Sequence, residues 1–220
     1  MRDWYVLADR LMAKYGAWAE KEFRRLRLTL PFDEINAMTA KARVDRLYAL
    51  LDGEARKMFL RIAKAAYEEA YAEAADGGAP EAWLNEDWID DFLLEYDPIT
   101  KYVYSHEVDR KRARFFESIV SDAAARNRLG LSLDFRTAGS LWQKQIAQYA
   151  ANAEDRAALQ AYRDADARRV RWITEMDGRQ CPVCEKRNRR IYPIDDIPPK
   201  PHYRCRCITI PVPGRGDESD

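Results

Sequence analysis

Histidine is almost absent from this chain of 220 residues, which contains only His106 and His202. Nucleophilic catalysis of the Ser–His or Cys–His kind requires a histidine base, so the sequence offers few ways to build such a site. It also lacks a Gly-x-Gly-x-x-Gly motif, a Walker-type phosphate loop and a His-Glu-x-x-His pair. We therefore expect a protein that is not an enzyme.

Long apolar runs are missing as well. No segment approaches the roughly 18 uninterrupted apolar residues of a membrane-spanning helix. The first residues, Met1 to Trp4, lack the apolar core of a signal peptide. These absences predict a soluble protein made in a reducing cytosol, where clustered cysteines favour metal binding over disulfides.

All four cysteines and one of the two histidines lie between residues 181 and 207. The spacing is Cys-x-x-Cys followed by His-x-x-Cys-x-Cys, in which each short pair can chelate one metal ion and the intervening loop brings the pairs together. Five donors can fill a tetrahedral shell, so the sequence predicts a structural Zn²⁺ rather than disulfides or a catalytic zinc with an open position. The expected ligands are Cys181, Cys184, His202 and Cys205, with Cys207 as the alternative ligand.

Apolar residues recur at steps of three and four through most of the first 174 residues, which predicts a mainly α, bundle-like domain. Gly53 suits the C-terminal cap of one helix, and Asn85 suits the N-terminal cap of another. Residues 76–80 form the clearest break and a candidate hinge. Helices are expected at about 3–28, 33–52, 59–75, 85–96, 106–126, 135–151 and 154–174.

Strand signals occur only in the cysteine region, at residues 190–192 and 208–210, which we expect to pair as a short β-hairpin. Two strands are not stable alone, and zinc would supply the missing folding free energy, on the order of 10 kcal/mol or more. The expected organisation is a helical domain at 1–174, a zinc-stapled module at 175–213 and a flexible tail at 214–220.

Charge is balanced overall, with 37 basic and 37 acidic residues, but it is unevenly distributed. Residues 65–100 contain eleven acidic residues and no Lys or Arg, whereas in residues 168–207 eleven basic residues outnumber five acidic ones. A solvated surface is the simplest interpretation of either block. The alternatives are that the blocks dock on each other, or that the basic module makes weak, non-specific contact with DNA phosphates while the acidic helices face another protein.

Several C-terminal segments together form a recognisable pattern that covers about residues 168–211. The segments are Arg171-Trp172-Ile173-Thr174, Asp177-Gly178-Arg179-Gln180-Cys181-Pro182-Val183-Cys184, Ile191-Tyr192-Pro193-Ile194, Pro198-Pro199 and His202-Tyr203-Arg204-Cys205-Arg206-Cys207-Ile208. The pattern resembles that of tailed-phage minor head proteins, the head-morphogenesis family that includes the F-like protein of phage Mu. Residues 96–107 resemble family members too, and Tyr203 stands where the family usually has proline.

This resemblance implies a virion protein present in few copies, bound to the portal inside the capsid and present in the host cytoplasm during assembly. It implies a role in head assembly or DNA passage, with the portal protein and other capsid proteins as partners and no membrane. The alternative function is a cytosolic, zinc-dependent regulator that binds nucleic acid.

Overall fold

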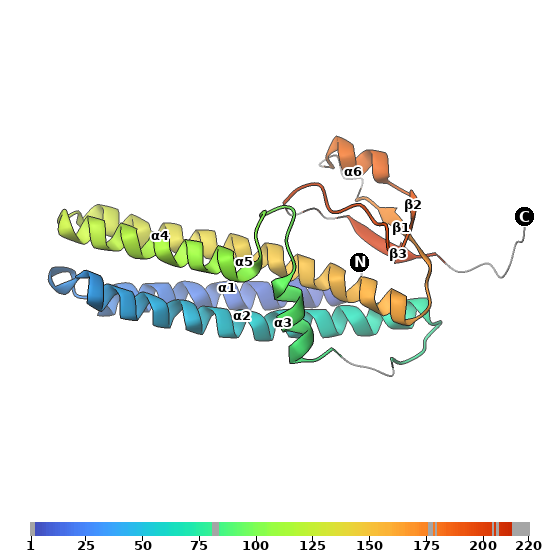
Figure 1. Cartoon of the computed structure of the whole chain (residues 1–220), viewed down its shortest axis with the longest axis horizontal. Helices are drawn as coiled ribbons and strands as arrows, with labels where there is room; N and C mark the ends of the chain where they lie inside the picture. Colours follow the sequence, from blue (N-terminus) through green and yellow to red (C-terminus); the bar gives the residue numbers. More distant parts are fainter. Residues whose placement is uncertain are drawn as a thin grey trace, which may run out of the picture.

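The computed structural model describes residues 3–80, 84–175, 178, 180–203, 205 and 207–212. Four long helices lie side by side, and a short helix, α3 (Glu86–Leu94), crosses them (Figure 1). The long helices are α1 (Asp3–Thr29), α2 (Ala37–Ala74), α4 (Tyr104–Ala124) and α5 (Arg128–Asp164). The mainly α fold predicted from the sequence is therefore confirmed, and the tail predicted at 214–220 lies outside the described residues.

The long helices form an antiparallel bundle in which α2 and α5 are the central pair. Both contact α1 and α4 as well as each other, and successive long helices run in opposite directions (Figure 1). The 38 residues of α2 give the bundle a length of about 57 Å. A turn of 3₁₀ helix, η1 (Phe32–Glu34), lies between α1 and α2.

A buried hydrogen-bond chain joins three of these helices at the centre of the bundle. The Trp142 indole N–H on α5 donates to the Tyr15 hydroxyl on α1 at 2.8 Å, and that hydroxyl donates to the Leu51 carbonyl on α2 at 2.8 Å. Trp142 is fully buried and meets Tyr48 edge to face, with ring centroids 5.4 Å apart. The Trp142 indole and the Tyr15 hydroxyl thus both have hydrogen-bond partners although they are buried. These two hydrogen bonds fix the relative positions of α1, α2 and α5.

Gly53 does not end a helix, which corrects the predicted boundary between helices at 33–52 and 59–75. Helix α2 runs through it without a break. The buried positions Val44, Leu51, Ala55 and Ile62 continue at helical spacing on both sides of the glycine. Packing of this continuous stripe outweighs the weak helix propensity of one glycine.

We therefore expect Gly53→Ala to stabilise the protein by about 0.5–1 kcal/mol in denaturant unfolding, because a Cβ there meets nothing within 4 Å and alanine reduces the freedom of the unfolded chain. Gly77→Ala is the matched control, since Gly77 has φ +89° and alanine is strained there. It should destabilise the protein, and equal effects at both sites would contradict the helical assignment.

The predicted helices at 135–151 and 154–174 also need correction. Residues up to Asp164 form one helix, α5, and residues Arg169–Ile173 form a strand, β1. A left-handed residue, Asp166 at φ 57°, lies in the turn between them. The domain predicted as helical to residue 174 thus contributes a strand to the C-terminal sheet.

The predicted hairpin is replaced by a three-stranded antiparallel sheet. Strands β2 (Ile191–Pro193) and β3 (Ile208–Pro211) do not pair with each other, because both pair with β1, which is central in the order β2-β1-β3. A six-residue helix, α6 (Pro182–Arg187), connects β1 to β2. The sheet to which the cysteine region contributes therefore starts with β1 at Arg169, ahead of residue 175, where the predicted module begins.

The module packs on the end of the bundle that carries the start of α1 and the end of α5 (Figure 1). Val170 and Ile194 join a buried cluster with Trp4, Tyr67 and Tyr162 from the helices. Trp172, two residues after Val170 and so on the same face of β1, packs against the cysteines. One face of β1 therefore contacts the bundle at Val170 and the cysteine cluster at Trp172.

Candidate metal centre

All five sulfur and imidazole donors predicted from the sequence come together at the cysteine cluster. They form two groups of three that share Cys184, one with Cys181 and His202 and one with Cys205 and Cys207. Within each group the donor atoms lie within 4.8 Å of one another. The cluster could hold a metal ion, and Cys184 is central to it because its sulfur lies 3.4 Å from His202 Nε2 and 3.5 Å from Cys205 Sγ.

His202 presents the correct nitrogen for metal binding. Its Nδ1 lies 3.0 Å from the Tyr203 carbonyl oxygen, which can only accept, so Nδ1 carries the proton. In the neutral ring Nε2 then has a free lone pair, and this is the atom directed at Cys184. A second ring nitrogen fixed by a carbonyl is the usual support of a histidine ligand.

The Cys181–Cys184 turn supports a thiolate. The Cys184 backbone N–H donates to Cys181 Sγ at 3.3 Å, and this bond, with others from the start of α6, lowers the pKa of Cys181. Burial instead raises the pKa of Cys184 to about 12. One sulfur of the pair is ready to bind a cation, and the other needs a cation beside it to lose its proton.

The Cys205–Cys207 pair also needs a nearby cation before both of its thiols can lose their protons. The hydrogen bond between the two thiols lowers the pKa of Cys207 to about 5 and raises that of Cys205 well above its usual value. The two sulfurs thus share one proton, because two thiolates cannot lie buried together. A divalent cation would displace that proton and neutralise the cluster.

Residues that sequence reasoning missed hold the donors in place. The buried Thr174 hydroxyl donates to the Cys184 carbonyl at 2.9 Å and lies 3.4 Å from Cys207 Sγ. The Arg187 guanidinium covers the Trp172 ring at 5.1 Å. Trp172 and Thr174 both belong to the C-terminal sequence pattern, but neither the role of the threonine nor that of Arg187 could be predicted before their neighbours were known.

Two contacts attach to α5 the loop that carries His202, residues 194–203, which we call the metal-binding loop because it contributes a candidate ligand. Lys200 Nζ lies 2.5 Å from Asp155 Oδ2, and the Tyr203 hydroxyl donates to the Lys144 carbonyl. Although burial lowers the pKa of Lys200, the Asp155 carboxylate raises it more, so the ammonium stays charged. The loop is thus tied to the bundle at both ends of the segment 200–203.

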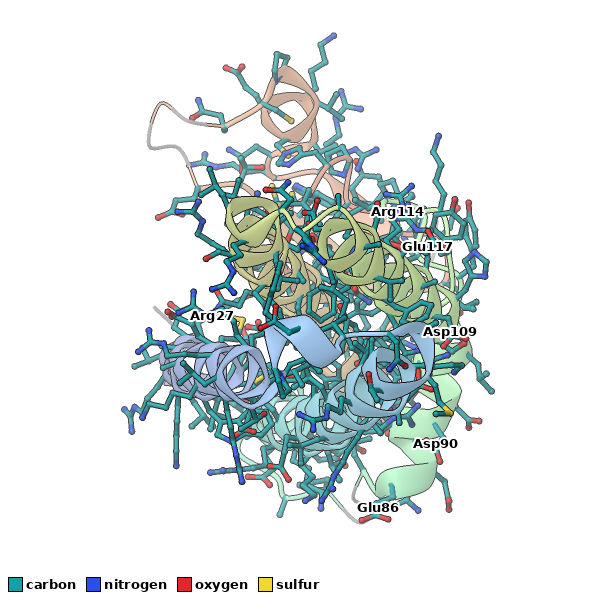
Figure 2. All side chains as sticks on the ribbon, turned by 90° about the vertical axis from the view of Figure 1, so that its left-hand side faces the viewer. Arg27, Glu86, Asp90, Asp109, Arg114 and Glu117 are labelled. Carbon is teal, nitrogen blue, oxygen red and sulfur yellow. The ribbon has the colours of Figure 1, made fainter. Side chains whose placement is uncertain are left out.

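The acidic run does not form one surface. Asp97 is buried and accepts from the Ile99 amide, whereas Asp90 and Glu95 pair with Arg56 on α2 and Arg156 on α5 rather than with the basic module. An exposed acidic face remains on α3, and Figure 2 shows two of its members at the side of the bundle. This acidic α3 face consists of Glu86, Asp87, Asp90 and Asp91. Glu81 of the run lies outside the described residues.

The module also carries exposed basic side chains, namely Arg168, Arg169, Lys186, Arg189 and Arg190. Arg179, Arg204 and Arg206 lie outside the described residues. The second histidine, His106, is far from the cluster in sequence and stacks on Tyr102 with ring centroids 4.7 Å apart. None of the helices in the described ranges combines the length and apolar character of a membrane span.

Comparison of the chain with protein families, curated proteins and solved structures finds no match to any of them.

Proposed function

We propose that the cluster is a structural zinc centre held by Cys181, Cys184, His202 and Cys205. Zinc fits because sulfur and imidazole donors at tetrahedral spacing are its usual ligands. The observation that carries the proposal is the position of Cys184 within reach of both the histidine and the second cysteine pair. With protein donors for every position, the ion would hold the sheet together rather than activate water.

Cys207 is the less favourable fourth ligand. The Thr174 hydroxyl has one proton, and the 2.9 Å bond to the Cys184 carbonyl uses it. The Thr174 oxygen also lies 3.4 Å from Cys207 Sγ, so this sulfur is already in contact with a group outside the donor set. Cys205 Sγ lies 3.5 Å from the shared Cys184 sulfur and has no such hydroxyl contact among the described residues.

We further propose that the protein is a non-catalytic minor head protein of the tailed-phage type, which binds the portal and assists head assembly or DNA passage. Support comes from the C-terminal pattern, whose Trp172, cysteine pairs and histidine meet at one buried cluster. The acidic α3 face supplies a surface that would be steered toward a basic partner.

The test is co-expression with the cognate portal protein, followed by co-purification and measurement of association rates. Glu86→Lys combined with Asp91→Lys should slow association about tenfold at low salt, because steering by exposed charge acts mainly on the on-rate. Asp90 is left unchanged because its reversal would also break the 2.5 Å contact with Arg56.

Glu117→Lys on α4 is the matched control, since Glu117 is exposed and lies apart from Glu86 in the end-on view (Figure 2). It should leave the rate unchanged. Native-like association of the double variant would remove the steering mechanism. Absence of the native chain from portal complexes and from procapsids would remove the head-protein proposal.

The exposed basic side chains of the module favour a second candidate, a zinc-dependent regulator that binds nucleic acid. Contacts from arginines to phosphates alone would be weak, non-specific and strongly reduced by salt. Retention of one DNA sequence at high salt, without association with the portal, would favour this candidate over the head protein.

A further inference from the structure

A groove lies between α1 and α5, and the metal-binding loop and β3 form part of its wall. It holds about 1230 Å³, above the roughly 300–1,000 Å³ of typical small-molecule pockets. Along α5 it extends from Gln143 to Glu154, a distance of about 16 Å. Ala13 and Ala17 on α1 leave it open to solvent along one side. These dimensions suit a segment of polypeptide.

The floor of the groove is apolar and built from both helices and the sheet. Its members are Met12, Ile146, Ala147, Ala151, Ile173 and Ile208. The small residues on the facing helices keep the floor wide, and a Cβ at Gly16 would meet only the Gln143 side chain, at 3.8 Å. A floor of this kind would bury apolar side chains of a bound segment.

Glu154 also lines the groove, where a buried acidic side chain is unexpected beside an apolar floor. The residue is only 6% exposed, and its Oε1 has no hydrogen-bond partner among the described residues. Burial, reinforced by the neighbouring Asp155, raises the pKa of the Glu154 carboxyl to about 8. The Trp4 indole and the Lys200 ammonium act on the same carboxyl group and oppose this rise in pKa only in part. A buried carboxyl oxygen without a hydrogen-bond partner is unfavourable, and a cationic group beside Oε1 would reduce that cost.

The charges around the groove are also predominantly negative. Asp9, Glu20 and Glu175 line it with Glu154, and Lys200 is the only cation among its described lining residues. The Lys200 ammonium contacts Asp155 at 2.5 Å and the Cys205 carbonyl at 3.4 Å. It is therefore engaged with α5 and with the backbone of Cys205, and the lining of the groove keeps an excess of acidic over basic side chains.

We propose that this groove binds a segment of a partner protein that inserts a lysine or arginine side chain beside Glu154. Apolar residues flanking that basic residue lie on the floor formed by α1 and α5, while Asp9 and Glu20 attract positive charge at the rim. This groove is separate from the acidic α3 face. The proposal therefore holds whether or not the partner is a portal protein.

The experiment is selection of peptides from a random dodecapeptide library on the zinc-loaded full chain. We expect the selected peptides to share a lysine or arginine flanked by apolar residues. Their dissociation constants should rise at least about tenfold with the E154Q chain. Replacing the basic residue of a selected peptide by norleucine should weaken binding to the native chain by a similar factor.

Two further pairs of variants keep the test independent of folding. Glu154→Gln preserves the shape of the side chain and removes its ability to ionise beside a cation. Circular dichroism and zinc content should therefore be unchanged, as in the control variant Glu117→Gln on α4. Ala13→Trp fills the open side of the groove and should weaken binding, whereas Ala113→Trp, at an exposed position of α4, should not. Selected peptides without a basic residue, or with equal affinity for the native and E154Q chains, would overturn the proposal.

Discussion

Replacing Cys184 by serine is expected to abolish zinc binding, lowering the metal content from about one ion per chain to nearly none. Cys184 belongs to both donor groups, so the result holds whether Cys205 or Cys207 completes the site. The measurement is metal analysis of the purified protein. Zinc retained at the native level would contradict the metal site itself.

The matched control is Cys207→Ser. Because the Thr174 hydroxyl contacts Cys207, we expect this variant to keep its zinc, while Cys205→Ser loses it. The reverse outcome would exchange the fourth ligand and leave the structural site in place. Serine is suitable in all three variants because it is close in size to cysteine and binds zinc poorly.

Loss of zinc should unfold the module without unfolding the bundle. A structural zinc contributes on the order of 10 kcal/mol to the folding of a small module, whereas the main core cluster of the bundle includes no described residue of that module. Circular dichroism after chelation should therefore show most of the helical signal. The thermal midpoint should nevertheless fall, because Val170 and Ile194 share a buried cluster with α1, α2 and α5. Cooperative loss of the helical signal would instead make the module integral to the main core.

The second large effect is expected in the bundle. Trp142→Ala should destabilise the protein by about 3–5 kcal/mol, because it leaves a cavity at a fully buried position and removes the donor to Tyr15. At this chain length that corresponds to a fall of about 10 °C in Tm. Denaturant and thermal unfolding measure the change, and zinc content should remain native-like.

Leu141→Ala is the matched control for this position. Leu141 precedes Trp142 on α5 but is 43% exposed, so its truncation should cost about 1 kcal/mol or less. Similar losses for the two variants would contradict the burial of Trp142. Together with Cys184→Ser, the pair separates the stability of the bundle from that of the metal centre.

Local patterns in the sequence determined the helical class and the donor set. Steps of three and four between apolar residues place one face of each helix in the core, so the class follows from residues close in the chain. Asn85 caps α3 as predicted, since its side chain accepts from the Trp88 amide at 3.0 Å. The spacing of the five donors was enough to predict them, because Cys and His residues two or three positions apart can chelate one metal ion.

Local patterns could not predict strand β1 (Arg169–Ile173) in the same way. Val170 and Ile173 are three residues apart and fit a helix face, although Arg169 to Ile173 also alternates apolar and polar residues. Pairing decides between the two, because β1 becomes the central strand only when residues near 192 and 210 supply partners on both edges. Those partners are about 20 and 40 residues away, beyond any local pattern.

What the sequence alone determined is thus the composition of each part: helices with one apolar face, and a set of cysteines and a histidine that could hold a metal ion. Tertiary structure alone decided that α2 continues through Gly53, that Thr174 and Lys200 hold the metal-binding loop, and that Glu154 lies buried beside an apolar groove. The physical reason is distance along the chain. Helix periodicity and chelating pairs depend on neighbours within about four residues, whereas burial and the partner of a charge depend on segments that only folding brings together.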